Sequence, residues 1–295
     1  MEQLDYIIIL LYFLGLIAVS VVMSRKIKNS EDMFIAGRNS SWWLSGVSSY
    51  MTIFSASTFV VWGGVAYKSG LVAVVVALCL GVASFIVGKW ISGKWRELRI
   101  KSPGEFLTIR FGHRTVSFYT ISGIIARAVH TAVSLYAVAV VMCALIKVDG
   151  GSIFASTGMM GDLSIWWALL ILGAIALGYT IAGGFLAVLM TDVIQFGVLL
   201  AVVVFMIPLS FNAVGGVSAF IDKASEIPGF FSGTSPTYTW GWLLLWIFLN
   251  VSMIGGDWPF VQRYISVPTT RDAKKSTYLI GILYLVTPLI WYLPT

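Results

Sequence analysis

Charged residues are scarce in this sequence. They make up 11% of its 295 residues, whereas apolar residues make up 58%. Soluble domains carry about 25% charged residues, so this low fraction excludes a disordered chain and an ordinary cytosolic enzyme. Cysteine is also rare, because only Cys79 and Cys143 occur, and both lie inside apolar runs. At such positions cysteines usually serve as small packing residues, which argues against a disulfide scaffold and against a metal site.

Motifs for catalysis and for ATP binding are absent as well. His113 and His130 have no serine or cysteine elbow beside them, so the sequence offers no nucleophile–base–acid set. It also lacks the glycine-rich P-loop that cradles the phosphates of ATP. We therefore expect no enzyme, no ATP as a partner and no organic cofactor.

The chain instead contains eight apolar runs, each long enough for a membrane-spanning helix of about 20 residues. Strands of a membrane barrel need only about 9–11 alternating residues, so these runs predict an all-α polytopic protein in a lipid bilayer. The 12 Trp and 12 Tyr suit its two membrane interfaces. The expected spans are Leu4–Met23, Trp42–Tyr67, Leu71–Trp90, Thr115–Ile146, Leu163–Ala182, Phe185–Phe211, Thr239–Gly256 and Ser276–Thr295.

Basic residues are distributed unevenly between the connections of these spans. With the N-terminus outside, 15 of the 19 Lys and Arg residues face the cytoplasm. The outer connections hold only Lys68, Lys147 and Lys223, and Arg127 lies within a span. Basic residues accumulate on the cytoplasmic side of membrane proteins. The pattern therefore predicts an outside N-terminus in a cell or inner membrane, and it explains the net charge of +6 without nucleic acid.

The second expected span is rich in hydroxyl groups. Ser48, Thr52 and Ser55 share one helical face, and Thr58 follows. Small hydroxyl residues are common where membrane helices pack closely, which is one interpretation. The other is a helix that unwinds inside the membrane, so that freed carbonyls and hydroxyls bind a hard cation such as sodium.

Four further polar residues lie in expected spans. Arg127 and His130 share a face near the middle of the fourth span, where an arginine costs about 2.5–3.5 kcal/mol to insert. The pair either attracts an anionic or hydroxyl-rich substrate or has only structural partners. Asp192 is either a buried carboxylate that needs a cation or a donor network, or a helix-start residue favoured by the dipole. Asn250 is a buried amide that can bond a polar substrate. Asp257, close to Arg263 in the sequence, is interpreted as part of an ion pair or a gate.

Several segments resemble the sodium:solute symporter family, which includes sodium-coupled sugar, proline, sialate and monocarboxylate transporters. Asp32–Arg38 is similar to the family's aromatic-x-x-Gly-Arg motif, and Tyr67–Gly70 to the end of its first core helix. Tyr179–Gln195 carries the most specific signature, with Gly-Gly, Ala-Val and Thr-Asp-x-x-Gln. Asp257 and Val261–Tyr264 resemble the end of core helix six. The resemblance covers residues 30 to 280 approximately.

The resemblance implies a LeuT-like fold, with ten core helices in two inverted five-helix repeats and one extra N-terminal helix. Residues 1–295 then form a single transmembrane domain. Within it, residues 4–23 are the extra helix, residues 42–211 the first repeat, and residues 239–295 the first two helices of the second repeat. The fold is expected to be incomplete, with about eight spans.

The resemblance also implies a sodium site and a substrate site. Backbone carbonyls of Met51 and Phe54 bind sodium at the break in core helix one, together with hydroxyls from a core helix eight that the sequence lacks. Asp192 lies on the inner sodium path or in a second sodium site. No metal other than sodium is expected. We assign substrate binding to Ser55, Thr58, Arg127, His130 and Asn250, of which Thr58 and Asn250 fall where sugar-binding members contact substrate.

The leading hypothesis is a sodium-coupled secondary active symporter, importing a sugar or an organic acid by alternating access. Two alternatives remain open at this point. A membrane sensory module of the same fold would carry a signalling domain after residue 295. A non-transporting truncated remnant would have a true stop after Thr295, because the chain holds only half a sodium site.

Overall fold

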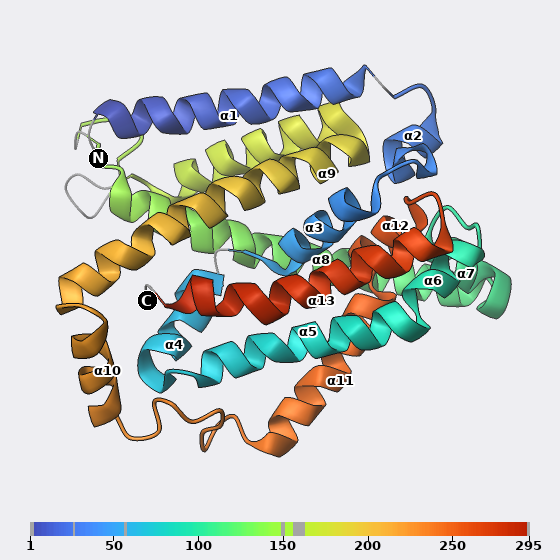
Figure 1. Cartoon of the computed structure of the whole chain (residues 1–295). Coiled ribbons are helices and arrows are strands. Elements are labelled where there is room, and N and C mark those ends of the chain that lie inside the picture. Colours follow the sequence, from blue (N-terminus) through green and yellow to red (C-terminus); the bar gives the residue numbers. More distant parts are fainter. Residues whose placement is uncertain (1–2, 26, 56–57, 149–150, 156–162, 294–295) are drawn as a thin grey trace. The chain divides into compact units, whose positions relative to one another are not determined.

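The computed structural model describes residues 3–25, 27–55, 58–148, 151–155 and 163–293, and the regular elements within these ranges are helices (Figure 1). The chain divides into two compact units. The first contains Met1–Phe34 and Gly104–Thr191, and the second contains Ile35–Pro103 and Asp192–Thr295.

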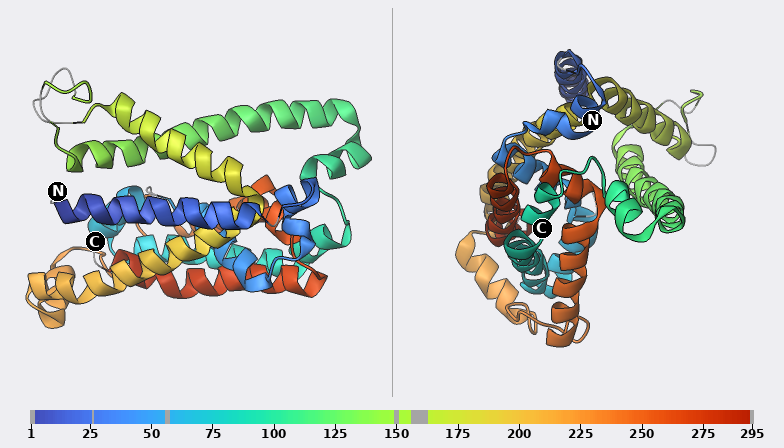
Figure 2. Two further views of the ribbon diagram at one scale, coloured as in Figure 1. Left: turned by 90° about the horizontal axis from the view of Figure 1, so that it is seen from above. Right: turned by 90° about the vertical axis from the view of Figure 1, so that its right-hand side faces the viewer.

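In the first unit, the end of α8 (His113–Leu145) packs against the beginning of α9 (Ile165–Val214) (Figure 2). Ala139 and Ala168 are fully buried between them, because small side chains let the two helices approach closely. Ala139 is the single buried residue of α8, whose Ile and Val side chains otherwise face outward. The unit also contains α1 (Gln3–Ser24), most of α2 (Ser30–Ile35) and most of α7 (Pro103–Phe111).

Helix α9 is interrupted at Gly184. Its 50 residues are far more than the roughly 20 that cross a bilayer, and Gly184 has φ 60° and ψ −167°, outside the helical range. A β-carbon at this position would lie 2.9 Å from Cδ1 of Ile27 and 3.2 Å from the Met33 carbonyl oxygen. Only glycine combines this backbone with so little space. The break lies between two predicted spans, Leu163–Ala182 and Phe185–Phe211.

In the second unit, α13 (Thr270–Tyr292) packs along α5 (Val72–Trp90) and α3 (Trp42–Ile53), and α11 (Trp240–Gly256) packs on α5 (Figure 1). The helices α11 and α12 (Trp258–Ile265) meet at a bend of 51°. The remaining elements are η1 (Ala36–Arg38), η2 (Thr58–Trp62), α4 (Gly63–Ser69), α6 (Ser92–Glu97) and α10 (Val217–Glu226).

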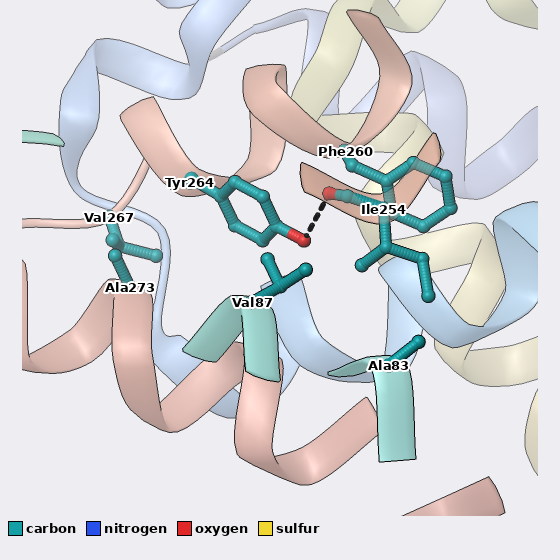
Figure 3. Close-up of a cluster of buried hydrophobic side chains, with 7 residues drawn as sticks. All are labelled: Ala83, Val87, Ile254, Phe260, Tyr264, Val267 and Ala273. Carbon is teal, nitrogen blue, oxygen red and sulfur yellow. Dashed lines mark hydrogen bonds between the residues drawn. The ribbon is translucent and has the colours of Figure 1, made fainter. Parts of the chain in front are cut away.

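A buried cluster holds α12 against α5 and α11 (Figure 3). Tyr264 and Ile254 are both fully buried, and the Tyr264 hydroxyl donates a hydrogen bond of 2.9 Å to the Ile254 carbonyl. This bond satisfies a polar group that would otherwise be costly to bury. Val87 of α5 and Phe260 of α12 complete the contact. The cluster therefore fixes the position of α12, which carries Arg263.

By length and composition, four described helices can cross a membrane, or five if the bent pair of α11 and α12 is one span. The four are α1, α5, α8 and the part of α9 from Gly183 to Val214. Helix α3 has only 12 residues, because the second expected span is interrupted. Helix α13 begins with a polar turn that contains Arg271 and Asp272. The number of eight membrane spans that the sequence predicts therefore stays a prediction.

Candidate functional site

The second expected span, Trp42–Tyr67, is broken in the structure. Helix α3 ends at Ile53, and Phe54 has an extended backbone with φ −75° and ψ 123°. In a continuous helix the Ser55 N–H would donate to the Met51 carbonyl, but it donates to Oγ1 of Thr58 at 3.2 Å. The Thr58 N–H donates in turn to the Ser55 carbonyl at 2.9 Å. The span is therefore unwound next to Met51 and Phe54, as one of the two interpretations of its hydroxyl pattern requires.

A cavity of about 180 Å³ lies beside this break. Phe54 and Thr58 line it from the broken span, and Asn250 lines it from α11. The structure thus brings together two of the predicted substrate residues, Thr58 and Asn250. The rest of the lining is mainly apolar and aromatic and includes Trp62, Trp246, Tyr284 and Trp291. Apolar walls with a few placed polar groups are typical of small-molecule sites.

Asn250 presents a polar group to this cavity. Its side chain is only 3% exposed, and its Nδ2 donates to the Trp246 carbonyl one turn earlier at 2.8 Å. Among the described residues, its amide oxygen accepts no hydrogen bond. The indole Nε1 of Trp246 is buried and lacks an acceptor in the described part of the chain. One acceptor and one donor are therefore left without protein partners near the cavity wall.

The end of α3 is anchored to α13 through Tyr50. Its side chain is fully buried, and its hydroxyl lies 2.7 Å from Oγ1 of Thr287. The Trp291 indole N–H donates to the same hydroxyl at 2.5 Å. The rings of Trp291 and Phe54 are 5.1 Å apart. Sequence reasoning missed Tyr50, because a tyrosine within an apolar run gives no sign of its partners more than 200 positions away.

Asp192 is paired with Arg263. Arg263 Nη2 lies 3.2 Å from Asp192 Oδ2, and the two side chains are 7% and 17% exposed. Ser48 joins them, since its hydroxyl donates to the carboxylate and accepts from Arg263 Nε, 2.8 Å away. Arg263 Nη1 also donates to the Pro259 carbonyl at 2.8 Å. Asp192 thus has both the cation and the donor that a buried carboxylate needs.

This charge pair, defined as Asp192 with Arg263, joins two helices, and Ser48 adds a third. Ser48 belongs to α3, Asp192 to α9 and Arg263 to α12. Sequence reasoning also interpreted Asp257, close to Arg263 in the chain, as part of an ion pair or a gate, and this interpretation stays a prediction. In the structure the Asp257 carboxylate accepts the Trp258 N–H at 2.9 Å and so caps the start of α12. Asp192 and Arg263 are 71 positions apart in the chain, so no local sequence pattern predicted their contact.

Arg127 and His130 lie on α8 in the first unit, whereas the cavity is lined by residues of the second unit. Arg127 is partly buried and His130 is exposed. Their assignment to substrate binding stays a prediction. Within the described ranges, no group of three or more His, Cys, Asp or Glu side chains is arranged to hold a metal ion.

Comparison with known proteins gives consistent matches. The model of the sodium:solute symporter family matches residues 33–294. A sodium/sialic acid symporter of Aliivibrio fischeri is 25% identical over 98% of this chain and 56% of its own length. A sodium/glucose cotransporter of Vibrio parahaemolyticus is 27% identical over 99% of this chain and 54% of its own length. The chain thus spans about half the length of these curated relatives.

The fold is similar to that of a solved structure, the substrate-bound outward-open state of a Na+-coupled sialic acid symporter. The TM-score is 0.83, with 22% identity over 99% of this chain and 59% of that one. This likeness confirms the predicted all-α, LeuT-like fold class.

Proposed function

Because the chain belongs to the sodium:solute symporter family, we propose that it forms part of a sodium-coupled symporter that imports a small polar solute by alternating access. Membership makes it an integral membrane protein and assigns it to transporters rather than enzymes. The observation that carries the proposal is the cavity beside the broken helix, where Thr58 and Asn250 meet. A membrane helix tolerates such a break only where it is buried or lines a cavity.

The solute is a sugar or an organic acid. The relatives named above transport sialic acid and glucose with sodium, and both solutes offer hydroxyl groups. Asn250 supplies an acceptor for them and Thr58 a hydroxyl, while the aromatic walls pack against the apolar faces of a sugar ring. Ser55 holds Thr58 in place through the two hydrogen bonds across the break.

Sodium binds at the break, to the carbonyls of Met51 and Phe54. Their position where α3 ends supports this assignment, because a carbonyl without a helical donor is a suitable ligand for a hard cation. Asp192 binds sodium on the inner path. Its carboxylate contacts the ion while sodium passes and Arg263 when sodium is absent.

The remaining parts of the proposal concern topology. The N-terminus lies outside, residues 4–23 form the extra helix, and residues 42–211 form the first inverted repeat. The glycine break in α9 supports a division between the fourth and fifth helices of that repeat. Residues 239–295 supply the first two helices of the second repeat.

The test is uptake into proteoliposomes by the protein made from its native gene. Radiolabelled sialic acid, hexoses and monocarboxylates are offered with an inward sodium gradient or with potassium on both sides. At about 100 mV, one inward charge supplies roughly 2.3 kcal/mol, and a tenfold sodium gradient about 1.4 kcal/mol. A neutral solute moved with one sodium is therefore accumulated several-hundredfold. If Arg127 and His130 bind an anion, more than one sodium per cycle is expected.

Two variants address the sites. Asn250→Ala is expected to reduce uptake at least tenfold, because it removes a buried group that bonds the solute. Asn212→Ala, at an exposed position near the end of α9, is the matched control and leaves uptake unchanged. Asp192→Asn is expected to raise the sodium concentration for half-maximal uptake. Uptake that is independent of sodium for every solute would refute the proposal, and an unchanged sodium dependence in Asp192→Asn would remove Asp192 from the sodium path.

A further inference from the structure

Three arginines gather in the second unit, around η1 and α6. Arg38 belongs to η1, Arg96 lies in α6, and Arg99 follows α6. Arg38 Nη2 donates to the Arg99 carbonyl oxygen at 2.9 Å. Arg96 donates to the carbonyls of Val267 and Pro268 at 2.5 and 2.8 Å. The guanidinium groups of Arg38 and Arg96 are thus bonded to neutral carbonyl oxygens, and that of Arg38 lies against the backbone of Arg99.

In the described part of the chain, this arginine cluster, defined as Arg38, Arg96 and Arg99, has no anionic partner. Among the described residues, no carboxylate lies within ion-pair distance of any of the three. Burial, followed by the positive charges of Arg38 and Arg99, lowers the pKa of the Arg96 guanidinium. Arg38 also keeps a buried Nε without an acceptor in the described part of the chain. The cluster thus combines like charges with an unused donor.

The backbone of the cluster is held in an uncommon conformation. Arg38 has φ +59° and Arg99 has φ +53°, in the left-handed region that residues with a side chain rarely adopt. Such a conformation costs about 1–3 kcal/mol at each residue and is common at binding sites. Here the two residues with this backbone are also joined by the hydrogen bond from Arg38 to the Arg99 carbonyl.

We propose that Arg38, Arg96 and Arg99 form a binding site for a phosphate group, either of an anionic lipid headgroup or of a free phosphate ion. Planar guanidinium groups bind phosphate oxygens through paired hydrogen bonds. A phosphate would neutralise the cluster and provide an acceptor for the Arg38 Nε.

The surroundings of the cluster favour the lipid as the source. Its three arginines are among the basic residues on the predicted cytoplasmic side. In the same unit, Lys89 lies over the ring of Trp90 at 4.7 Å and Lys275 over that of Trp42 at 5.6 Å. Tryptophan and lysine of this kind mark the headgroup level of a bilayer, where basic pockets between helices bind anionic lipids.

The experiment measures thermal unfolding of the purified native-gene protein in a neutral detergent. Three probes are titrated separately: short-chain phosphatidylglycerol, phosphatidylcholine of the same chain length, and inorganic phosphate. The test variant is Arg99→Gln, because the structure uses the backbone oxygen of Arg99 and leaves its side chain exposed. Arg271→Gln is the matched control, since Arg271 is an exposed arginine of the same unit outside the cluster. Arg99→Lys keeps the positive charge but removes the planar guanidinium group that donates paired hydrogen bonds.

Phosphatidylglycerol is expected to stabilise the wild type and Arg271→Gln equally, and phosphatidylcholine to have no effect. Arg99→Gln should raise the half-saturating lipid concentration about fivefold, which corresponds to about 1 kcal/mol for one basic residue. The half-saturating concentration of Arg99→Lys should lie between those of the wild type and Arg99→Gln. Stabilisation by inorganic phosphate with the same variant pattern would assign the site to the free ion. Equal lipid responses of Arg99→Gln and Arg271→Gln, or no stabilisation by either phosphate-bearing probe, would overturn the proposal.

Discussion

Removing both members of the charge pair is expected to destabilise the protein by less than the two single removals added together. In Arg263→Met, the Asp192 carboxylate keeps the Ser48 hydroxyl as its donor but loses its cation. In Asp192→Asn, the Arg263 guanidinium keeps Ser48 and the Pro259 carbonyl but loses its anion. The double variant contains neither charge, so no buried ion is left without a counterion. Part of the loss of stability seen in the single variants therefore disappears.

The size of the effect follows from the distance and the burial. At 3.2 Å and an effective dielectric constant of about 20, the attraction between the two charges is roughly 5 kcal/mol. Most of it is offset by the cost of taking both ions out of water, so the intact pair adds little net stability. Breaking such a pair from one side typically costs about 3–5 kcal/mol. The double variant should therefore be less destabilised than the sum of the singles, by about 2 kcal/mol or more.

The assay is a double-mutant cycle by thermal unfolding in detergent, with Arg271→Met as the surface control. We expect each single variant to unfold roughly 5–10 °C earlier than the wild type, and the control to stay within about 1–2 °C. If sodium replaces Arg263 beside Asp192, sodium ions should also restore part of the stability of Arg263→Met and none of that of the double variant. If the destabilisation of the double variant equals the sum of those of the two single variants, the coupling between Asp192 and Arg263 and the reasoning from their burial are refuted.

Three further changes test the scaffold. Gly184→Ala should destabilise by more than 1 kcal/mol, because of the positive φ and the 2.9 Å contact. Gly173→Ala, in a helical stretch of α9 with open space, should be neutral or stabilising in the same melting assay. Tyr50→Phe should cost about 1–3 kcal/mol, since the Trp291 indole loses its acceptor, and tryptophan fluorescence should shift. Asp257→Ala should cost about 0.5–2 kcal/mol through loss of the α12 cap, measurable as an earlier unfolding midpoint.

The long apolar elements were predictable because burial in a membrane dictates their composition. Val72–Trp90 and Trp240–Gly256 agree with the expected spans to within one residue at each end. The break after Ile53 was not visible in hydropathy, since the run continues with Phe, Val and Trp after the interruption. Only its unusual number of hydroxyl groups pointed there, and packing explained that pattern equally well.

The polar contacts were less predictable, because they depend on tertiary structure. Thr58 and Asn250 were chosen from a resemblance, and the structure brings them to one cavity. Asp192 was read either as a carboxylate that needs a cation or donors or as a helix-start residue, and in the structure it contacts Arg263 and Ser48. Arg263 lies on a helix whose place is set by the buried cluster around Tyr264. No local pattern encodes such a contact.

Helix α3 connects the two polar sites. Ser48 contacts the charge pair, and Ile53, the last residue of the helix, lines the cavity five residues later, about 7.5 Å along the helix. Tyr50, between them, ties the same helix to α13. A displacement of α3 that opens the cavity therefore also changes the distance between Ser48 and Arg263. Because one rigid element contributes to both places, occupation of the cavity and rupture of the charge pair have a physical route to be coupled, without a longer chain of contacts.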